Sequence, residues 1–241
     1  MGRRGSHAKN ETEEFVLRKG DLLWLAALGG VSSLLLIPAS HELFVEVTKN
    51  HPYLMGFCKF GILATMGEVL AIRIGAGRWN QPPGLIYRAG VWGLIGMLIV
   101  LMFEIFSSGV AGASAKGLLG SKDGALTKML NPFLISAIMN LTFAPAFMIA
   151  HRITDVYIDL TCGEKLSFNE VRLAMVLDRI DWQNMISFVV MRTIPFFWIP
   201  AHTIVFLLPP EYRVLLAAYL AIALGAILSY AKKGKLESFH S

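Results

Sequence analysis

Four polar side chains lie inside long apolar stretches of this sequence, and their chemical types suit ionic or proton-transfer chemistry. They are Glu68, Asn140, Arg192 and His202. A charged side chain at the middle of a bilayer costs about 2.5 to 3.5 kcal/mol on insertion scales, so such residues are functional candidates by default. We therefore treat these four residues as the candidate lining of a polar cavity or pore.

Glu68 is the strongest of these candidates. It lies one helical turn after Thr65 and directly after Gly67, so this face of the predicted helix is small and polar. Such a face could line a water-filled path, and a carboxyl group there could take up a proton. The alternative is a structural glutamate that pairs with Arg192 or is hydrogen-bonded to Asn140. Both interpretations fit the sequence.

The other charged residues near apolar stretches have ordinary explanations. Lys59 stands nine residues before Glu68, which puts the two on opposite faces of one helix, and we expect Lys59 to extend toward the outer membrane surface. Arg88 and Arg213 stand at the starts of predicted spans, where contact with lipid headgroups is expected. His202 has no second ligand at a metal-binding spacing, so a packing role is favoured.

No catalytic or cofactor-binding motif accompanies these residues. The sequence has no GxSxG, HExxH or P-loop pattern and no paired acidic motif in a span. Cys58 and Cys162 form neither a CxxC motif nor a Cys/His metal spacing. We therefore expect no cofactor and no metal, and we do not expect an enzyme.

The composition predicts an integral membrane protein. Of the 241 residues, 55% are apolar and 16% are charged, against roughly 25% charged in a typical soluble domain. A net charge of +5 could indicate nucleic-acid binding, but the basic residues stand next to apolar spans rather than on a polar face. The lipid bilayer is the expected partner, a homo-oligomer is possible, and no nucleic-acid partner is expected.

The hydropathy pattern predicts an all-α polytopic helix bundle with about six transmembrane helices. Residues 1–21 form a polar segment and 232–241 a basic tail, on either side of a single transmembrane domain at 22–231. Pro145 predicts a kink, and Ser167 with Glu170 forms a capping-box pair that predicts an interfacial amphipathic helix near 165–182. The predicted spans are 22–38, 53–74, 85–106, 129–150, 185–208 and 213–231.

The distribution of basic residues predicts the orientation. With the N-terminus inside, the inner segments hold fifteen Lys and Arg residues and the outer segments hold four. We therefore expect both termini on the cytoplasmic side, in a bacterial plasma membrane if the source is prokaryotic and in an organelle membrane otherwise. Cys58 and Cys162 would then lie toward opposite faces, which argues against a disulfide between them.

Two groups of residues follow the spacing of a known family. The first group is Pro52, Gly61, Leu63, Gly67 and Glu68, and the second is Trp198, Pro200, Pro209, Arg213, Leu228 and Ser229. Their joint spacing resembles the Mpv-seventeen family, which includes the twenty-two kilodalton peroxisomal membrane protein. The resemblance covers roughly residues 44–233, and it departs from the family pattern at Glu68, where the family has Asp, and at Leu224, where it has Trp.

The resemblance implies a pore or permeation path for small solutes, with Glu68, Thr65, Asn140, Arg192 and His202 as its polar lining. A structural or scaffold membrane protein, in which buried polar groups hold helices together, is the alternative. An intramembrane enzyme acting on lipid is less favoured, because no catalytic motif is present. A common hydrated space around these polar residues would favour permeation, and direct contacts among them in a dry bundle would favour the scaffold.

Overall fold

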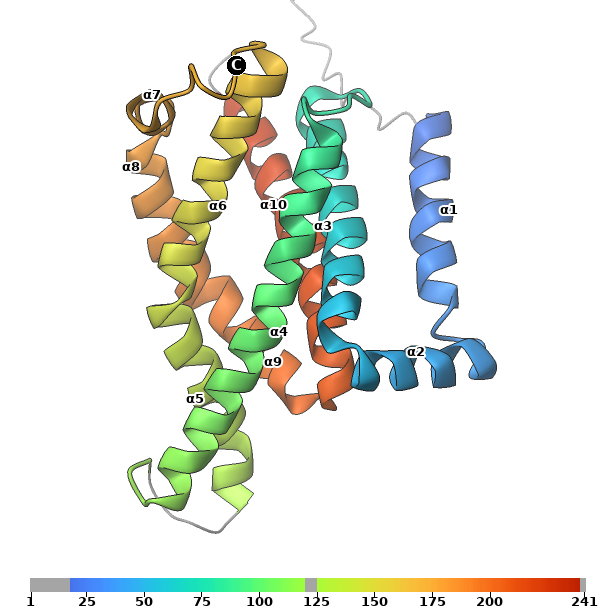
Figure 1. The fold of residues 1–241 in the computed structure, drawn as a ribbon, viewed down its shortest axis with the longest axis vertical. Helices are drawn as coiled ribbons and strands as arrows, with labels where there is room; N and C mark the ends of the chain where they lie inside the picture. The colour runs from blue at the N-terminus through green and yellow to red at the C-terminus, as the bar shows by residue number, and fades with distance from the viewer. Residues whose placement is uncertain (1–17, 120–124, 239–241) are drawn as a thin grey trace, which may run out of the picture.

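The computed structural model describes residues 18–119 and 125–238, which form helices joined by short turns and contain no strand within these ranges. The all-helical class predicted from the sequence is therefore confirmed. Figure 1 shows a bundle of long helices, with one short helix lying across one of its ends.

The centre of the bundle is an antiparallel hairpin of α3 (Pro52–Ala76) and α4 (Leu85–Ala115). Gly56 and Gly96 let the two backbones approach closely, because a Cβ atom on Gly56 would lie 2.7 Å from the carbonyl oxygen of Gly96. The turn between the helices has a glycine in the left-handed conformation at each end, Gly77 (φ 67°) and Gly84 (φ 65°). This turn fixes which residues of α4 face the second half of α3.

The last helix, α10 (Pro210–Ser238), packs along the other side of α3. A Cβ atom on Gly67 would lie 2.9 Å from the Cα atom of Ile222, so a glycine is required at this contact. Buried residues of α3, α4, α5, α9 and α10 form one continuous apolar core, with Leu63 and Ala218 among its least exposed members.

The N-terminal region consists of two helices rather than one span followed by a polar segment. α1 (Lys19–Ser33) and α2 (Pro38–Asn50) meet at 77°, and α2 lies across one end of the bundle (Figure 1). The predicted span 22–38 is therefore too long at its end, because Pro38 begins a new helix instead of closing the first. A buried ion pair between Asp21 and Arg73, 2.8 Å from Oδ1 to Nε, attaches α1 to α3.

The fourth predicted span is a bent pair, α5 (Ala125–Thr142) and α6 (Ala144–Ile158). The two helices meet at 49°, and Pro145 stands in the first turn of α6. Proline lacks the N–H group that would continue the helix, which explains the break. The predicted kink is confirmed.

The fifth predicted span contains an unusual wide helix. Residues Met185–Trp198 form a π-helix (η2), which continues directly into α9 (Ile199–Leu207). Pro195 lies inside η2 and Pro200 in the first turn of α9, so two backbone N–H groups are missing within one turn and a half of helix.

The predicted interfacial helix at 165–182 is not present as such. A π-turn (η1, Asp159–Gly163) is followed by a turn at 168–170, by α7 (Leu173–Asp178) and by α8 (Trp182–Asn184). Only half of the capping box forms, because the Glu170 carboxylate accepts from the Ser167 backbone N–H at 2.7 Å. Val176 and Ile180 of this segment are buried in a second apolar cluster, whereas Phe168 and Leu173 are exposed.

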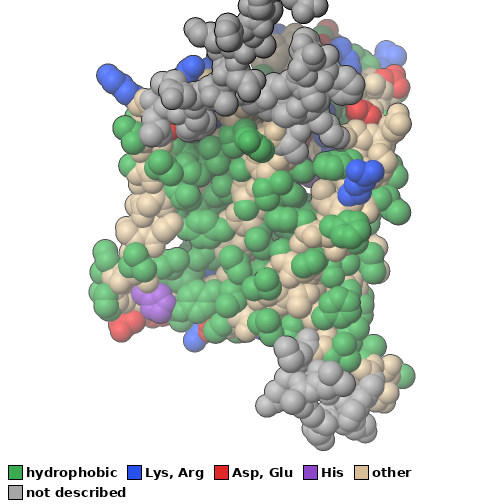
Figure 2. Space-filling model, turned by 180° about the vertical axis from the view of Figure 1, so that it is seen from behind, with side chains coloured by type: hydrophobic (Ala, Val, Ile, Leu, Met, Phe, Trp, Pro, Cys, Tyr) green, Lys and Arg blue, Asp and Glu red, His purple; other side chains and the backbone are tan. Residues whose placement is uncertain are grey.

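Within residues 18–119 and 125–238, four helices are long and apolar enough to cross a membrane, and up to six spans result if each bent pair counts as one. The four are Pro52–Ala76, Leu85–Ala115, Trp182–Leu207 and Pro210–Tyr230. Figure 2 shows hydrophobic side chains over the middle of one face of the molecule and charged ones mostly toward its ends. These features fit a membrane-embedded protein.

Candidate functional site

Arg88 is the centre of a buried ionic cluster. It stands one turn into α4, is 6% exposed, and its guanidinium group contacts three carboxylates. Nη1 lies 2.5 Å from Glu68 Oε1 and 3.1 Å from Asp155 Oδ1, and Nη2 lies 2.7 Å from Asp159 Oδ1. These contacts connect α3, α4 and α6 with η1. They also compensate the positive charge of Arg88, which burial has removed from water.

Two aromatic rings complete the surroundings of Glu68. Trp92, one turn after Arg88 in α4, donates its indole N–H to Glu68 Oε2 at 3.3 Å. The ring of His151 lies 4.2 Å from that of Trp92, and His151 Nδ1 lies 3.1 Å from Asp155 Oδ2. Glu68 and Asp155 are therefore held by an aromatic residue as well as by Arg88.

This cluster corrects two expectations about charged residues. Arg88 was expected at the headgroups, and the structural alternative for Glu68 placed it beside Arg192 or Asn140, whereas the two residues pair with each other. The glycine-bounded turn at 77–84 causes the difference, because it folds the start of α4 against the last turns of α3. The other two carboxylates could have been found from the sequence. Asp155 and Asp159 are four residues apart, so they share one helical face on which a cation could bind both.

Lys59 also differs from its expected position. It is 6% exposed and points into the protein, where its ammonium group donates to Thr48 Oγ1 at 3.1 Å and to the Glu211 carbonyl at 3.4 Å. Helix α2 lies across the start of α3 and covers this side chain, so its ammonium group contacts protein groups at that end of the bundle rather than being exposed.

Asn140 and His202 form a second, separate polar contact. The Asn140 amide Nδ2 lies 3.0 Å from His202 Nδ1 and donates to the Ser136 carbonyl at 2.8 Å. This contact joins α5 to α9, and Trp198 stacks on the imidazole ring with 5.0 Å between ring centroids. Both residues were predicted to line a polar cavity, and the structure brings these two together.

Arg192 and Thr65 are not brought to these polar groups. Arg192 lies on η2 with its side chain exposed, while its neighbours Thr193 and Ile194 turn inward. Thr65 is half-buried, and its hydroxyl has no hydrogen-bond partner among the described residues. Neither residue lines the cavities described next.

Three cavities follow one another from the α3–α4 turn into the bundle. The mouth cavity (820 Å³) lies beside Asn80, Pro82 and Arg88 at the turn. The middle cavity (510 Å³) shares four lining residues with it, namely Glu68, Ala71, Arg152 and Ser229. The inner cavity (80 Å³) shares a further five with the middle one, namely Trp92, Phe147, Met148, Trp198 and Ala221. Glu68 thus stands where the mouth and middle cavities meet, and Asn140 and His202 line the inner one.

A pair of aromatic rings lies next to His202, which lines the inner cavity. The rings of Phe103 and Phe206 lie 4.9 Å apart, and Phe103 meets the edge of the His202 ring at 5.7 Å. Both phenylalanines are nearly fully buried, and Phe103 also lines a separate pocket at the opposite end of the bundle. Phe103 therefore lies between His202 of the inner cavity and that pocket.

The residues that carry the family resemblance occupy packing and helix-end positions. Pro52 begins α3, Pro200 lies in the first turn of α9, and Pro209 directly precedes α10. Arg213 donates from Nε to the Leu208 carbonyl at 2.9 Å and so completes the end of α9. A Cβ atom on Gly61 would lie 3.3 Å from the carbonyl oxygen of Ala89, a close contact between α3 and α4.

Comparisons with family models, with characterised proteins and with solved structures find no match for this chain. The resemblance to the Mpv-seventeen family therefore rests on the spaced residues alone. Within the described residues, no group of three or more His, Cys, Asp or Glu side chains is arranged to hold a metal ion. The carboxylates around Arg88 surround a guanidinium group instead.

Proposed function

We propose that this protein provides a gated permeation pathway for small polar solutes across its membrane. The observation that carries the proposal is the line of mouth, middle and inner cavities, joined through shared lining residues, with Glu68 where the first two meet. The spaced residues that resemble the Mpv-seventeen family give a second, independent support.

In this pathway the described conformation is the closed one. Phe103 and Phe206 form an apolar barrier beyond the inner cavity, and such constrictions exclude water and ions. A solute would enter beside Arg88 and Arg152, pass Glu68 and Trp92, and cross when the two rings separate. The walls of the mouth cavity carry both signs of charge, which favours small polar solutes over apolar ones.

The test is solute efflux from proteoliposomes loaded with sized neutral and charged dyes. We expect a size cutoff in the wild type, a changed rate or charge preference in Glu68→Gln, and faster efflux in Phe103→Ala, which opens the aromatic barrier. Arg192→Gln is the matched control, because Arg192 is exposed outside the cavities. Equal efflux from all four proteins would contradict the proposal.

A scaffold function is the second candidate, and one specific observation favours it. Asn140 and His202 contact each other directly in a cavity of only 80 Å³, and Arg88 holds three helical segments to α4. Buried polar contacts of this kind can fix the arrangement of helices without forming a path. Vesicles that stay tight with every variant would favour this function, and a partner search by crosslinking would follow.

We further propose six spans with both termini on the cytoplasmic side. In Figure 1 the start of α1, the α3–α4 turn, the segment around α7 and the end of α10 lie at one end of the bundle. The same segments hold the excess of Lys and Arg residues. Labelling of single cysteines by a membrane-impermeant maleimide in intact cells, with Lys49→Cys expected to react and Arg78→Cys not, tests this orientation.

A further inference from the structure

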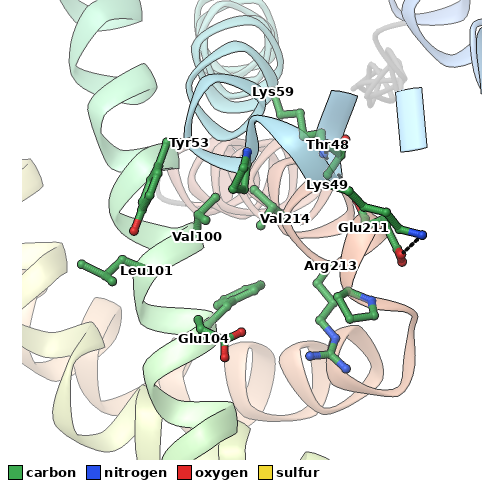
Figure 3. A pocket seen from close by; sticks show the side chains of 13 residues that line it. Thr48, Lys49, Tyr53, Lys59, Val100, Leu101, Glu104, Glu211, Arg213 and Val214 are labelled. Atoms are coloured by element: carbon green, nitrogen blue, oxygen red, sulfur yellow. Dashed lines mark hydrogen bonds and ion pairs between the residues drawn. The ribbon is translucent and has the colours of Figure 1, made fainter. Parts of the chain in front are cut away.

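A separate pocket lies at the end of the bundle opposite the mouth cavity. Its volume is 330 Å³, and it is bounded by α2, the start of α3, the middle of α4 and the start of α10 (Figure 3). We call it the end pocket. Its charged lining residues are Lys49, Lys59, Glu104, Glu211 and Arg213.

Only two of these five charges are paired with each other. Lys49 Nζ lies 3.0 Å from Glu211 Oε1 at the rim of the pocket, as the dashed line in Figure 3 marks. Lys59, Arg213 and Glu104 form no ion pair with any residue that the structure describes. Three charges therefore line one pocket without a partner of opposite sign in contact.

Lys59 is the most informative of the three, because it is 94% buried. Two of its three ammonium protons have acceptors, Thr48 Oγ1 and the Glu211 carbonyl, and the ring of Phe44 lies 4.4 Å from Nζ. These acceptors are neutral and the third proton has none among the described residues. A buried ammonium group without a counter-charge is unfavourable, so an anion in the pocket would stabilise it.

Arg213 adds a second source of positive potential. Its guanidinium group donates to the carbonyls of Leu208 and Phe206, which accounts for two of its five N–H groups. Helices α3 and α10 also begin at this pocket, at Pro52 and Pro210, and a helix N-terminus carries a partial positive charge. The α3 and α10 side of the pocket therefore favours an anionic oxygen group.

Glu104 gives the opposite side of the pocket a negative charge. It comes from α4, and Figure 3 shows it across the hollow from Arg213. Its only hydrogen bond within the described residues is from the Ser108 hydroxyl at 2.7 Å. A ligand that fills the pocket must therefore present a negative group toward Lys59 and Arg213 and a positive group with N–H donors toward Glu104.

We propose that the end pocket binds a phosphoethanolamine group, with the phosphate against Lys59 and Arg213 and the primary ammonium against Glu104. The group could belong to the headgroup of a membrane phospholipid or to soluble phosphoethanolamine, since both present the same atoms. Apolar lining residues next to the charged ones, including Leu101 (39% exposed) and Tyr53 (45% exposed), offer a surface for the glycerol and acyl part of a lipid. This inference does not depend on the proposed permeation function.

The test is binding to purified, delipidated full-length protein, followed by native mass spectrometry. The probes are short-chain phosphatidylethanolamine, phosphatidylcholine and phosphatidylglycerol, together with soluble phosphoethanolamine. We expect phosphatidylethanolamine to bind about tenfold tighter than the other two lipids, because choline has no N–H donor for Glu104 and glycerol has no positive charge. Binding of soluble phosphoethanolamine with similar affinity would assign the site to a free solute, and its failure to bind would assign the site to a lipid headgroup.

Two substitutions and their controls separate the site from general lipid adhesion. Lys59→Met should weaken phosphatidylethanolamine binding about tenfold, the loss of one charge-assisted contact. Lys116→Met, at an exposed residue directly after α4, should not. Glu104→Gln should abolish the preference over phosphatidylcholine, while Glu42→Gln in α2 should keep it. Glu104 and Glu42 are both exposed, so folding of these variants is not in question. Equal binding of the three lipids by the wild type, or an unchanged preference in Glu104→Gln, would overturn the proposal.

Discussion

Arg88 and Lys59 are equally buried cations at opposite ends of the α3–α4 hairpin, and their surroundings differ in charge. Arg88 contacts three carboxylates, whereas Lys59 contacts a hydroxyl, a carbonyl and an aromatic ring. The two cations are therefore equally buried, but only the charge of Arg88 is compensated by carboxylates of the described residues in contact with it. The Arg88 end is a compensated ionic cluster that holds helices together, and the Lys59 end is a pocket with charge left for a ligand.

The strongest test of this difference is Arg88→Met. The substitution leaves Glu68, Asp155 and Asp159 close together without a cation, and removing one partner of a buried pair typically costs about 3 to 5 kcal/mol. We expect a loss of this size in the free energy of unfolding, measured by denaturant titration in mixed micelles. Arg179→Met, at an exposed pair with Glu164, is the control and should change it by less than about 1 kcal/mol. A loss as small as that of the control would show that the cluster is hydrated rather than buried.

A packing substitution provides the next largest effect. Gly67→Val places side-chain atoms against the backbone of Ile222, where a Cβ atom already has only 2.9 Å, and overpacking of this kind costs about 1 to 3 kcal/mol. Because the α3–α10 contact brings Glu211 and Arg213 to the end pocket, we also expect weaker ligand binding there. Gly109→Ala is the control, since the described chain places nothing within 4 Å of that position. Unchanged stability in Gly67→Val would mean that α10 shifts freely along α3.

A graded effect is expected within the Arg88 cluster. The Asp159 side chain is 47% exposed, so Asp159→Asn should reduce the free energy of unfolding by at most about 1 kcal/mol. The Asp155 side chain is 18% exposed and also contacts His151, so Asp155→Asn should cost more. A larger loss of unfolding free energy in Asp159→Asn than in Asp155→Asn would mean that the pair at the mouth of the cavity contributes more to stability.

The smallest effect on stability is expected for Lys59→Met. Methionine has a similar shape, and the substitution removes a buried charge that has no carboxylate partner in the described part of the chain. We expect the free energy of unfolding to change by less than about 1 kcal/mol, since replacing a buried ion by an apolar side chain is often neutral or stabilising. A loss comparable to that of Arg88→Met would remove the distinction between the two ends.

The helices themselves were largely predictable from the sequence. α3, α4 and α10 cover the predicted spans 53–74, 85–106 and 213–231. α3 exceeds its span by less than a turn at each end, and α4 and α10 extend beyond theirs by about two turns at the C-terminal end. The kink at Pro145 was predicted from the missing N–H of proline. The segment 165–182 was not, because its apolar residues at helical spacing pack into a local cluster through turns rather than along one continuous helix.

Some of the polar residues could be recognised from the sequence, but their partners could not. Asn140, His202 and Glu68 were recognised as unusual because polar groups in apolar stretches stand out in the sequence itself. Arg88 and Lys59 were assigned to the membrane surface because each stands near a helix end, where lipid contact is the common explanation. Their burial depends on α6 and α2, which approach from distant parts of the chain.

The sequence by itself determined which long segments form apolar helices suited to a membrane, because the length and hydrophobicity of a segment decide whether it can cross a bilayer as a helix. Tertiary structure alone decided which charges meet. Ion pairing depends on distances of a few ångströms between side chains, and those distances are set by glycine contacts, helix bends and the 77–84 turn acting together. For that reason Arg88 has three carboxylate partners among the described residues and Lys59 has none, a difference that neither residue's place in the sequence reveals.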